Sequence, residues 1–353
     1  MTQPQIDDRQ SEDTQARYRD NFARHLISIA LYLQSEVMNA LKEKHGHEQL
    51  RISFQPYITL SGRNGARLSD IADILGISRQ AANQTANQIV AAGYLERWAD
   101  PSDGRAKLLL PTPRALDVVD QGTREALRLQ REVERLAGKA SIEACSKSLT
   151  DLLRALHLPL LGIEFTDGGE TLPLAVMLPR LSDYINSRLM QLTMARGHPD
   201  LKLSFGQVLT AIGPRGGRIQ QMAESHHVSK QAISAIANEL ESLGYIRRDP
   251  DPKDARQVVL RFTDRGEQLI ADSVDSVDDL LEEFAQHIGW PSLLELEQIL
   301  QRIYWKLHLE EEIFGNGTGD ETDIRLLARR LDRQLGETGA RALGQLLLSG
   351  DFY

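Results

Sequence analysis

Hydrophobic positions along the chain predict two long amphipathic helices that lie far apart in the sequence. In each, apolar residues recur every three or four positions, which places them on one face of a helix that packs against a core. Gly46 and Gly197 follow these segments and are expected to end the helices. The apolar positions are Leu26, Ile29, Ala30, Leu33 and Val37 in the first segment, and Leu178, Leu181, Ile185 and Leu189 in the second.

The same series of shorter elements is predicted behind each long helix. After a polar turn between two strands, two further helices complete the series. Pro111 and Pro113 remove backbone donors, so the second strand of the first series is expected to be short. In the first series the expected elements are helices at about 54–61, 68–75 and 78–92, strands at Leu95–Trp98 and Lys107–Leu110, and helices at about 113–137 and 141–158.

An internal repeat explains why the two series match. At an offset of 151 residues, 51–116 aligns with 202–267 without a gap, and over the central stretch about 17 of about 50 positions are identical. The chain therefore carries a duplicated domain. Identical pairs include Phe54 and Phe205, Ala72 and Ala223, Ser78 and Ser229, Gln80 and Gln231, Asn87 and Asn238, Tyr94 and Tyr245, Asp100 and Asp251, Asp103 and Asp254, Arg105 and Arg256, and Thr112 and Thr263.

The repeat and the chain length of 353 residues predict two cores, because one compact domain usually holds about 150 residues. Thr166–Glu170, rich in Gly and Asp, lies at the centre of the expected linker. Two short leucine-rich helices near the end of the sequence have no counterpart between the copies, and we expect them to dock within the chain. The predicted domains are 20–160, a linker at 161–172, a second unit at 173–312, and a C-terminal helical extension at 313–353.

The segment from Leu68 to Ala81 has the layout of a helix, a tight turn and a second helix. Gly76 lies in the turn, and Ser78 stands where an N-cap hydroxyl would satisfy the free N–H groups of the following helix. On a 3.6-residue period, the outer face of that second helix is Arg79, Gln80, Asn83, Gln84 and Asn87.

The equivalent helix of the second copy begins after Ser229. Its inner face is expected to hold Ala232, Ile233, Ile236, Leu240 and Leu243, and its outer face Lys230, Gln231, Ser234, Ala235 and Asn238. Amides beside one cation suit a DNA major groove, where amides pair with adenine and the cation pairs with guanine or phosphate. Taken alone, such a face is equally typical of an ordinary solvated helix.

A polar hairpin follows each of these helices and favours the DNA interpretation. Pro, Asp and Gly residues form the turn, and Arg105 and Arg256 project from its return side. Arginine gains from the enhanced negative potential of a narrow minor groove. The alternative is that Asp103 and Asp254 only hold these arginines in local ion pairs, and we expect such pairs to orient them.

These motifs resemble the MarR family of winged helix-turn-helix regulators, over about residues 20–160 and 172–312. The resemblance implies a bacterial, cytoplasmic, non-enzymatic transcription regulator that binds double-stranded DNA and responds to a small aromatic or anionic effector. It implies a mainly α fold with small β wings and no cofactor. The candidate DNA-binding residues are Ser78, Arg79, Gln80, Asn83, Gln84, Asn87, Arg97, Arg105 and Lys107 in the first copy, and Ser229, Lys230, Gln231, Ser234, Asn238, Arg247, Arg248, Lys253 and Arg256 in the second.

The chain departs from the family in being fused. Family members are usually homodimers, whereas two tandem copies predict a monomeric pseudo-dimer with both half-site readers in one chain. Fusion permits asymmetry, because Asn83-Gln84 in one copy stands opposite Ser234-Ala235 in the other. The larger number of cations near the second wing leads us to expect more phosphate affinity from the second copy.

Composition adds one objection and several exclusions. A net charge of −9 opposes DNA binding, although the acids concentrate away from the predicted contact segments. No apolar run is long enough to span a membrane, and no signal sequence is recognised. The single cysteine, Cys145, cannot form an intramolecular disulfide, and we interpret it as a buried or inert thiol rather than a redox sensor.

No active site is recognised in the sequence. His226-His227 lacks further ligands at metal-binding spacing and is interpreted as an ordinary turn. Phosphate-binding loops, paired catalytic carboxylates and Ser/His/Asp arrangements are not found. The alternatives to a DNA-binding regulator are a winged-helix module that binds proteins, and a small-molecule sensor in which only one copy contacts DNA.

Overall fold

The computed structural model describes most of the chain, and the described residues form two compact units. Unit 1 takes in the described residues up to Leu203 together with Asp264–Leu309. Unit 2 takes in the described residues of Ser204–Thr263 together with Glu310. The described residues are 8–75, 77–100, 107–158, 160, 172–213, 216–225, 228–251 and 254–310.

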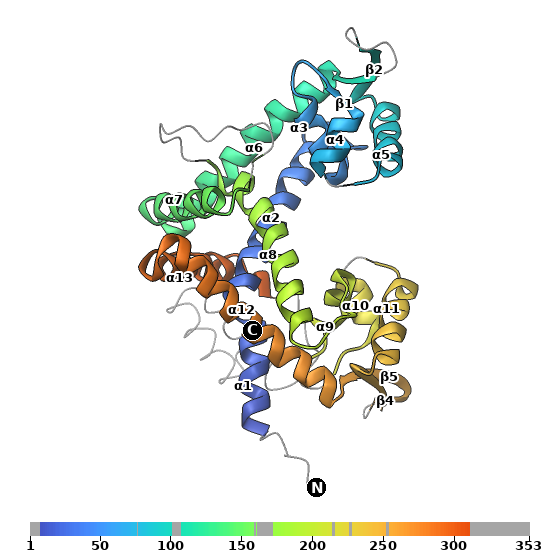
Figure 1. Ribbon diagram of the computed structural model, residues 1–353, viewed down its shortest axis with the longest axis vertical. Coiled ribbons are helices and arrows are strands. Elements are labelled where there is room, and N and C mark those ends of the chain that lie inside the picture. The colour runs from blue at the N-terminus through green and yellow to red at the C-terminus, as the bar shows by residue number, and fades with distance from the viewer. Residues whose placement is uncertain are drawn as a thin grey trace, which may run out of the picture. The chain divides into compact units, whose positions relative to one another are not determined.

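Unit 1 contains long helices from both sequence repeats and, between α2 and α6, the small elements of the first winged helix (Figure 1). The long helices are α1 (Asp8–Arg19), α2 (Phe22–Glu43), α6 (Pro113–Ala137), α7 (Lys139–Ala155), α8 (Leu174–Ala195), α12 (Asp264–Ile288) and α13 (Trp290–Lys306). The small elements are η1 (Ile52–Phe54), α3 (Gln55–Ser61), β1 (Ala66–Arg67), α4 (Leu68–Leu75), α5 (Arg79–Ala91), β2 (Leu95–Ala99) and β3 (Lys107–Pro111).

The long helices pack into one helical body that both repeats build. Helix α2 contacts α6, α8 and α13, and α12 contacts α1, α7, α8 and α13. Phe22 on α2 meets Phe284 on α12 edge-on, with ring centroids 6.0 Å apart. Burial of apolar surface holds these helices together. The predicted inner positions with no more than 1% exposure are Leu26, Ile29 and Leu33 on α2, and Leu178, Leu181 and Ile185 on α8.

A three-stranded antiparallel sheet with strand order β1-β3-β2 completes the first winged helix. Leu95 on β2 pairs with Pro111 on β3, and Ala66 on β1 pairs with Leu109 on β3. The hairpin strands β2 and β3 were predicted, whereas β1 was not. The side chains of Tyr94, just before β2, and of Leu109 on β3 are almost fully buried. The sheet is therefore anchored in the core of the first winged helix.

Unit 2 repeats this arrangement on a smaller scale. In place of β1 it has a single bridge, in which Gly217 and Leu260 exchange two backbone hydrogen bonds of 2.9 Å. These two residues occupy the repeat positions of Ala66 and Leu109. The elements are η2 (Leu203–Phe205), α9 (Gly206–Leu209), α10 (Ile219–Ser225), α11 (Lys230–Ser242), β4 (Ile246–Asp251) and β5 (Asp254–Phe262).

Both sheets depend on a glycine with positive φ just before the bridging position. Gly65 has φ of +77° and Gly216 has φ of +86°. A Cβ at Gly65 would lie 3.1 Å from the carbonyl oxygen of Leu109, and one at Gly216 would lie 2.6 Å from that of Leu260. Glycine is the residue that tolerates both this conformation and this approach of two backbones.

The structure differs from the predicted elements in two places. Helix α1 was not predicted, because its polar sequence carries no long apolar stripe. In unit 1 it packs against α12. Helix α9 covers only Gly206–Leu209, less than the repeat predicts. The second wing strand of the first copy is short as expected, since β3 has five residues and β5 has nine, although both end at the same repeat position, Pro111 and Phe262.

The predicted domain limits were drawn from the sequence repeat, whereas the two units are defined by how compactly the chain packs. The units therefore do not test the predicted limits, which stay predictions. Most of the predicted linker at 161–172 and all of the predicted extension at 313–353 lie outside the described residues, as do Gly76 and the pair His226-His227.

Candidate nucleic-acid interface

Helix α5 in unit 1 presents the predicted polar face to solvent. Its N-cap is Ser78, whose hydroxyl oxygen accepts a 3.1 Å hydrogen bond from the backbone N–H of Ala81. Ala82, Ala86 and Ile89 are buried on the opposite face. The candidates Arg79, Gln80, Asn83, Gln84 and Asn87 are all exposed. Arg79 forms no hydrogen bond or ion pair with any described residue, so its guanidinium is open to solvent.

Helix α11 in unit 2 repeats the cap. Ser229 accepts a 3.1 Å hydrogen bond from the N–H of Ala232. The candidates Lys230, Gln231 and Asn238 are exposed, and Ser234 is half-buried. The predicted inner face needs one correction, because Ala232 in the first turn is exposed while Ala237 is buried.

An arginine of the wing strand braces the exposed face of α5. Arg97 on β2 donates two hydrogen bonds of 2.8 Å from Nη2, to Oδ1 of Asn83 and Oδ1 of Asn87. All three residues were candidates, but the sequence did not indicate that they contact one another. The contact fixes the two asparagine side chains relative to the wing.

Unit 2 has a related brace with a different partner. Arg248, the repeat equivalent of Arg97, donates from Nη2 to Oδ1 of Asn238 at 2.6 Å. Its Nη1 forms an ion pair with the carboxylate of Glu241. Nothing in the sequence interpretation had singled out Glu241.

The structure describes only some of the other candidate residues of the wings. Lys107 is exposed at the start of β3, and Arg247 on β4 pairs with Asp249 at 3.1 Å. Arg105 and Lys253 lie outside the described residues, and so does the side chain of Arg256. The expected ion pairs of Asp103 and Asp254 with these arginines therefore stay predictions.

A buried aspartate holds the base of each wing. Arg67 on β1 donates from Nε to Oδ2 of Asp100 at 2.6 Å, and Arg218 donates from Nε to Oδ2 of Asp251 at 2.7 Å. The pairs occupy the same two repeat positions. The interpretation missed them, although identity of Arg67 with Arg218 at the repeat offset was an available signal.

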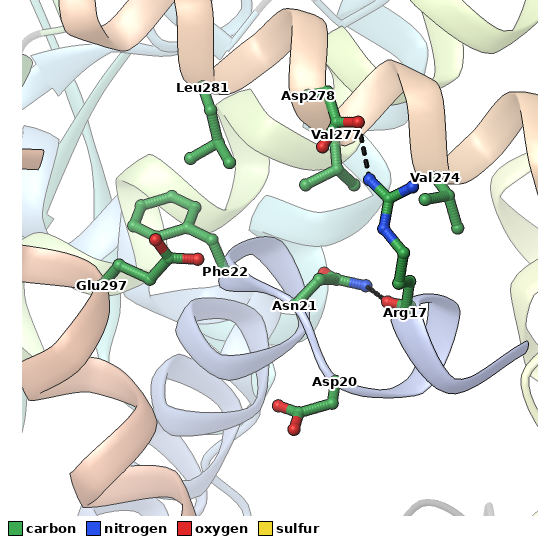
Figure 2. A pocket seen from close by; sticks show the side chains of 9 residues that line it. All are labelled: Arg17, Asp20, Asn21, Phe22, Val274, Val277, Asp278, Leu281 and Glu297. Carbon is green, nitrogen blue, oxygen red and sulfur yellow. Dashed lines mark hydrogen bonds and ion pairs between the residues drawn. The ribbon is translucent and has the colours of Figure 1, made fainter. Parts of the chain in front are cut away.

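A small cavity lies within unit 1, where α1 and α2 meet α12 and α13 (Figure 2). Its apolar wall includes Phe22 and Leu281, and its volume of about 140 Å³ is below the roughly 300 Å³ of typical small-molecule pockets. Arg17 on its rim donates a 2.6 Å hydrogen bond to Asp278 (Figure 2). Asp20 and Glu297 also line the cavity, so carboxylates predominate among its ionisable groups.

Two carboxyl groups of this cavity have shifted pKa values. Burial raises the pKa of Glu297, and no described residue forms a hydrogen bond or ion pair with its side chain. A hydrogen bond with His25, whose Nε2 lies 2.6 Å from Oδ1 of Asp20, lowers the pKa of Asp20. An anionic ligand in this cavity would be repelled by these carboxyl groups.

Cys145 is fully buried on α7, and burial raises the pKa of its thiol to about 12. This agrees with the interpretation as an inert thiol. Among the described residues, His, Cys, Asp and Glu side chains form no group of three or more that could hold a metal ion. No helix in the described part of the chain is long and apolar enough to cross a membrane.

Fold and site together define a tandem winged helix-turn-helix protein. Residues 59–106 and 200–257 each match the sequence model described as the MarR family. These matches include the helix-turn-helix and the first hairpin strand of each winged helix. The chain thus contains two MarR-like winged-helix units, one after the other. No curated protein matches the chain.

Three solved structures are similar to part of the chain. The transcriptional regulator Tm0710 from Thermotoga maritima is 20% identical over 37% of this chain and 93% of its own, with a TM-score of 0.30. The MarR family transcription regulator SP03579 is 21% identical over 37% and 87%, with a TM-score of 0.28. BldR from Sulfolobus solfataricus is 23% identical over 35% and 92%, with a TM-score of 0.26. These TM-scores are too low to carry an argument.

Proposed function

We propose that this protein is a sequence-specific DNA-binding transcription regulator. Helices α5 and α11 enter the major groove, and the two hairpins reach the minor groove as wings. The observation that carries the proposal is the pair of exposed, serine-capped helix faces, each with amide side chains and one cation in its first turn. Such side chains match the donors and acceptors of adenine and guanine in the major groove.

We further propose that one chain acts as a pseudo-dimer in the cytoplasm, without enzymatic activity. The helical body supports this proposal, because α2, α6 and α7 of the first repeat pack with α8, α12 and α13 of the second. Homodimeric regulators achieve the same packing with two chains. In the fused chain each half-site reader has its own sequence, so the operator need not be a palindrome.

A small effector is part of the proposal, but the described cavity argues against an anionic one. Asp20, Asp278 and Glu297 line it against a single guanidinium, that of Arg17, which already pairs with Asp278. An aromatic effector without negative charge is the better match in chemistry, and it must be small. Thermal stabilisation of the protein by candidate aromatic compounds is the direct measurement.

The test of DNA binding uses the full chain and genomic fragments from around its own gene. Affinity is measured by fluorescence anisotropy at several salt concentrations, and molecular mass in solution is recorded for the complex. We expect saturable, salt-sensitive binding by one chain per site, since each phosphate contact releases counterions. Absence of sequence-selective binding at low salt, with and without candidate effectors, would instead favour a protein-interaction module.

A double substitution links the binding to the proposed helices. Arg79→Ala with Lys230→Ala removes the first-turn cation of both helices, and we expect a loss of at least about tenfold in affinity and a shallower salt dependence. The matched control removes two exposed lysines of α7, Lys139→Ala with Lys147→Ala, and leaves both helix faces intact. Equal losses in the two double variants would show that only net charge matters.

A further inference from the structure

Three arginines of the second hairpin form ion pairs with carboxylates of the same unit. Arg248 pairs with Glu241 of α11, and Arg247 pairs with Asp249 at 3.1 Å. Asp249 also lies 3.5 Å from Nε of Arg261. Unit 2 therefore pairs Arg248 with Glu241 at its recognition helix, and pairs Arg247 and Arg261 with Asp249 on the hairpin.

In the equivalent region of unit 1, no described carboxylate pairs with Arg97, and the nearby Glu96 accepts a hydrogen bond from Trp98 instead. Position 241 corresponds to Val90, and position 249 corresponds to Trp98, neither of which carries a charge. Arg97 donates only to the neutral amide oxygens of Asn83 and Asn87. It uses Nη2 for both contacts, so Nε and Nη1 keep donors for another acceptor.

The two recognition helices differ in charge in the same sense. Helix α5 contains Arg79 and no acidic residue, whereas α11 contains Lys230 together with Glu239 and Glu241. Lys230 in addition donates to Oε1 of Gln220 at 2.7 Å, while Arg79 has no hydrogen bond or ion pair with a described residue. A phosphate approaching α11 thus meets cations that already have acceptors and carboxylates that repel it.

We propose that the two winged helices contribute unequally to DNA binding, with unit 1 supplying most of the phosphate affinity and Glu241 weakening unit 2 by competing with phosphate for Arg248. The inference rests on the proposed function and reverses the expectation from the number of cations alone. The DNA that this protein would select is a duplex with one strong and one weak half-site. Glu241 is a specificity-determining residue, since it leaves unit 2 more dependent on base contacts than on the backbone.

Four single variants of the full chain test this inference: Arg97→Gln, Arg248→Gln, Glu241→Gln and the control Glu295→Gln, an exposed carboxylate of α13. Affinity is measured by anisotropy for a genomic fragment that the wild type selects and for a random-sequence duplex, both across a salt series. Far-ultraviolet circular dichroism and thermal melting of each variant establish that it is folded.

We expect Arg97→Gln to weaken binding about tenfold, and Arg248→Gln to weaken it less than about threefold. Glu241→Gln is expected to strengthen binding about two- to fivefold, with a salt slope steeper by about 0.9 if one phosphate contact is gained. The control should stay close to the wild type.

The outcomes separate this inference from the proposed function. Equal losses for Arg97→Gln and Arg248→Gln, or an unchanged affinity for Glu241→Gln, overturn the inequality while sequence selection by the wild type upholds the function. If the wild type shows no sequence selection, but Arg97→Gln and Arg248→Gln lose unequal affinity for the random duplex, the inequality is upheld and the proposed function is overturned. A wild type that binds neither duplex overturns both.

Discussion

Arg67 donates a 2.6 Å hydrogen bond from Nε to the carboxylate of Asp100, which is only 6% exposed at the end of β2. The contact joins the short strand β1 to the point where the chain leaves for the wing tip. Its repetition by Arg218 and Asp251 shows that both wings are anchored in the same manner. The wing of each unit is thereby held by a charge-assisted hydrogen bond as well as by the sheet.

Arg67→Ala is predicted to lower the free energy of unfolding of unit 1 by about 1 to 3 kcal/mol, because a buried carboxylate loses its guanidinium donor. Denaturant unfolding without DNA measures the effect. Arg63→Ala removes a nearby exposed arginine that forms no hydrogen bond or ion pair with a described residue, and serves as the control. Identical midpoints for the two variants would contradict a structural role of the pair.

Gly216→Ala is predicted to destabilise unit 2 more than Gly65→Ala destabilises unit 1. Both positions have positive φ, but the added Cβ lies 2.6 Å from a backbone oxygen in unit 2 and 3.1 Å from one in unit 1. We expect losses of at least about 1 kcal/mol at both positions. Hydrogen exchange of the β4–β5 and β2–β3 amides measures each sheet separately. Faster exchange in the unit 1 variant than in the unit 2 variant would refute this order.

Glu125 on α6 is predicted to make stability depend on pH in the acid range. A hydrogen bond from Arg128, 2.6 Å between Nε and Oε2, is the main cause that lowers the pKa of this carboxyl group. A lowered pKa in the folded state contributes stability above the usual Glu value of about 4.3, and this contribution is lost as pH falls through the folded pKa.

Glu125→Gln should therefore cost about 1 to 2 kcal/mol at pH 7 and progressively less as the pH approaches 3. Denaturant unfolding at a series of pH values measures the difference from the wild type. Glu43→Gln removes an exposed carboxylate of α2 with no described partner and is the control. A cost for Glu125→Gln that stays constant from pH 7 to pH 3 would exclude the linkage.

Cys145 is predicted not to react with a disulfide reagent in the folded protein. With a pKa of about 12, roughly one thiol in ten thousand is ionised at pH 8, and the side chain is fully buried. Absorbance of the released thiolate should show no reaction before denaturation and one equivalent after it. Lys147→Cys places a thiol on the exposed face of the same helix and should react at once. Rapid labelling of the native wild type would contradict the predicted burial.

Periodicity predicted the elements that bury a continuous apolar face. The inner residues of α2 and α8 and the polar face of α5 follow directly from the 3.6-residue period, and the N-cap at Ser78 follows from the chemistry of its hydroxyl. Helix α1 could not be predicted from its own polar sequence. It packs against α12, and the sequence of α1 alone does not indicate this contact. Strand β1 is only two residues long, too short for any period to indicate.

The sequence predicted which side chains of the candidate site are exposed, but not which of them contact one another. Asn87 and Arg97 were both candidates, yet their hydrogen bond depends on how β2 crosses α5, which is a tertiary relationship. Counting cations favoured the second unit, whereas partner identity, seen at Arg248 and Glu241, favours the first. Charge counts ignore pairing, and pairing decides which guanidinium a phosphate can reach.

The shared helical body also removes a dependence on protein concentration. Helices from separate chains would come apart on dilution, because their association follows mass action. Here α2 and α8 belong to one polypeptide, so the linker holds one set of helices near the other at an effective concentration independent of the number of molecules in a cell. Formation of the body is a unimolecular step. A few copies of the chain would suffice to keep it assembled, and each molecule would carry one reader of each kind in a fixed one-to-one ratio.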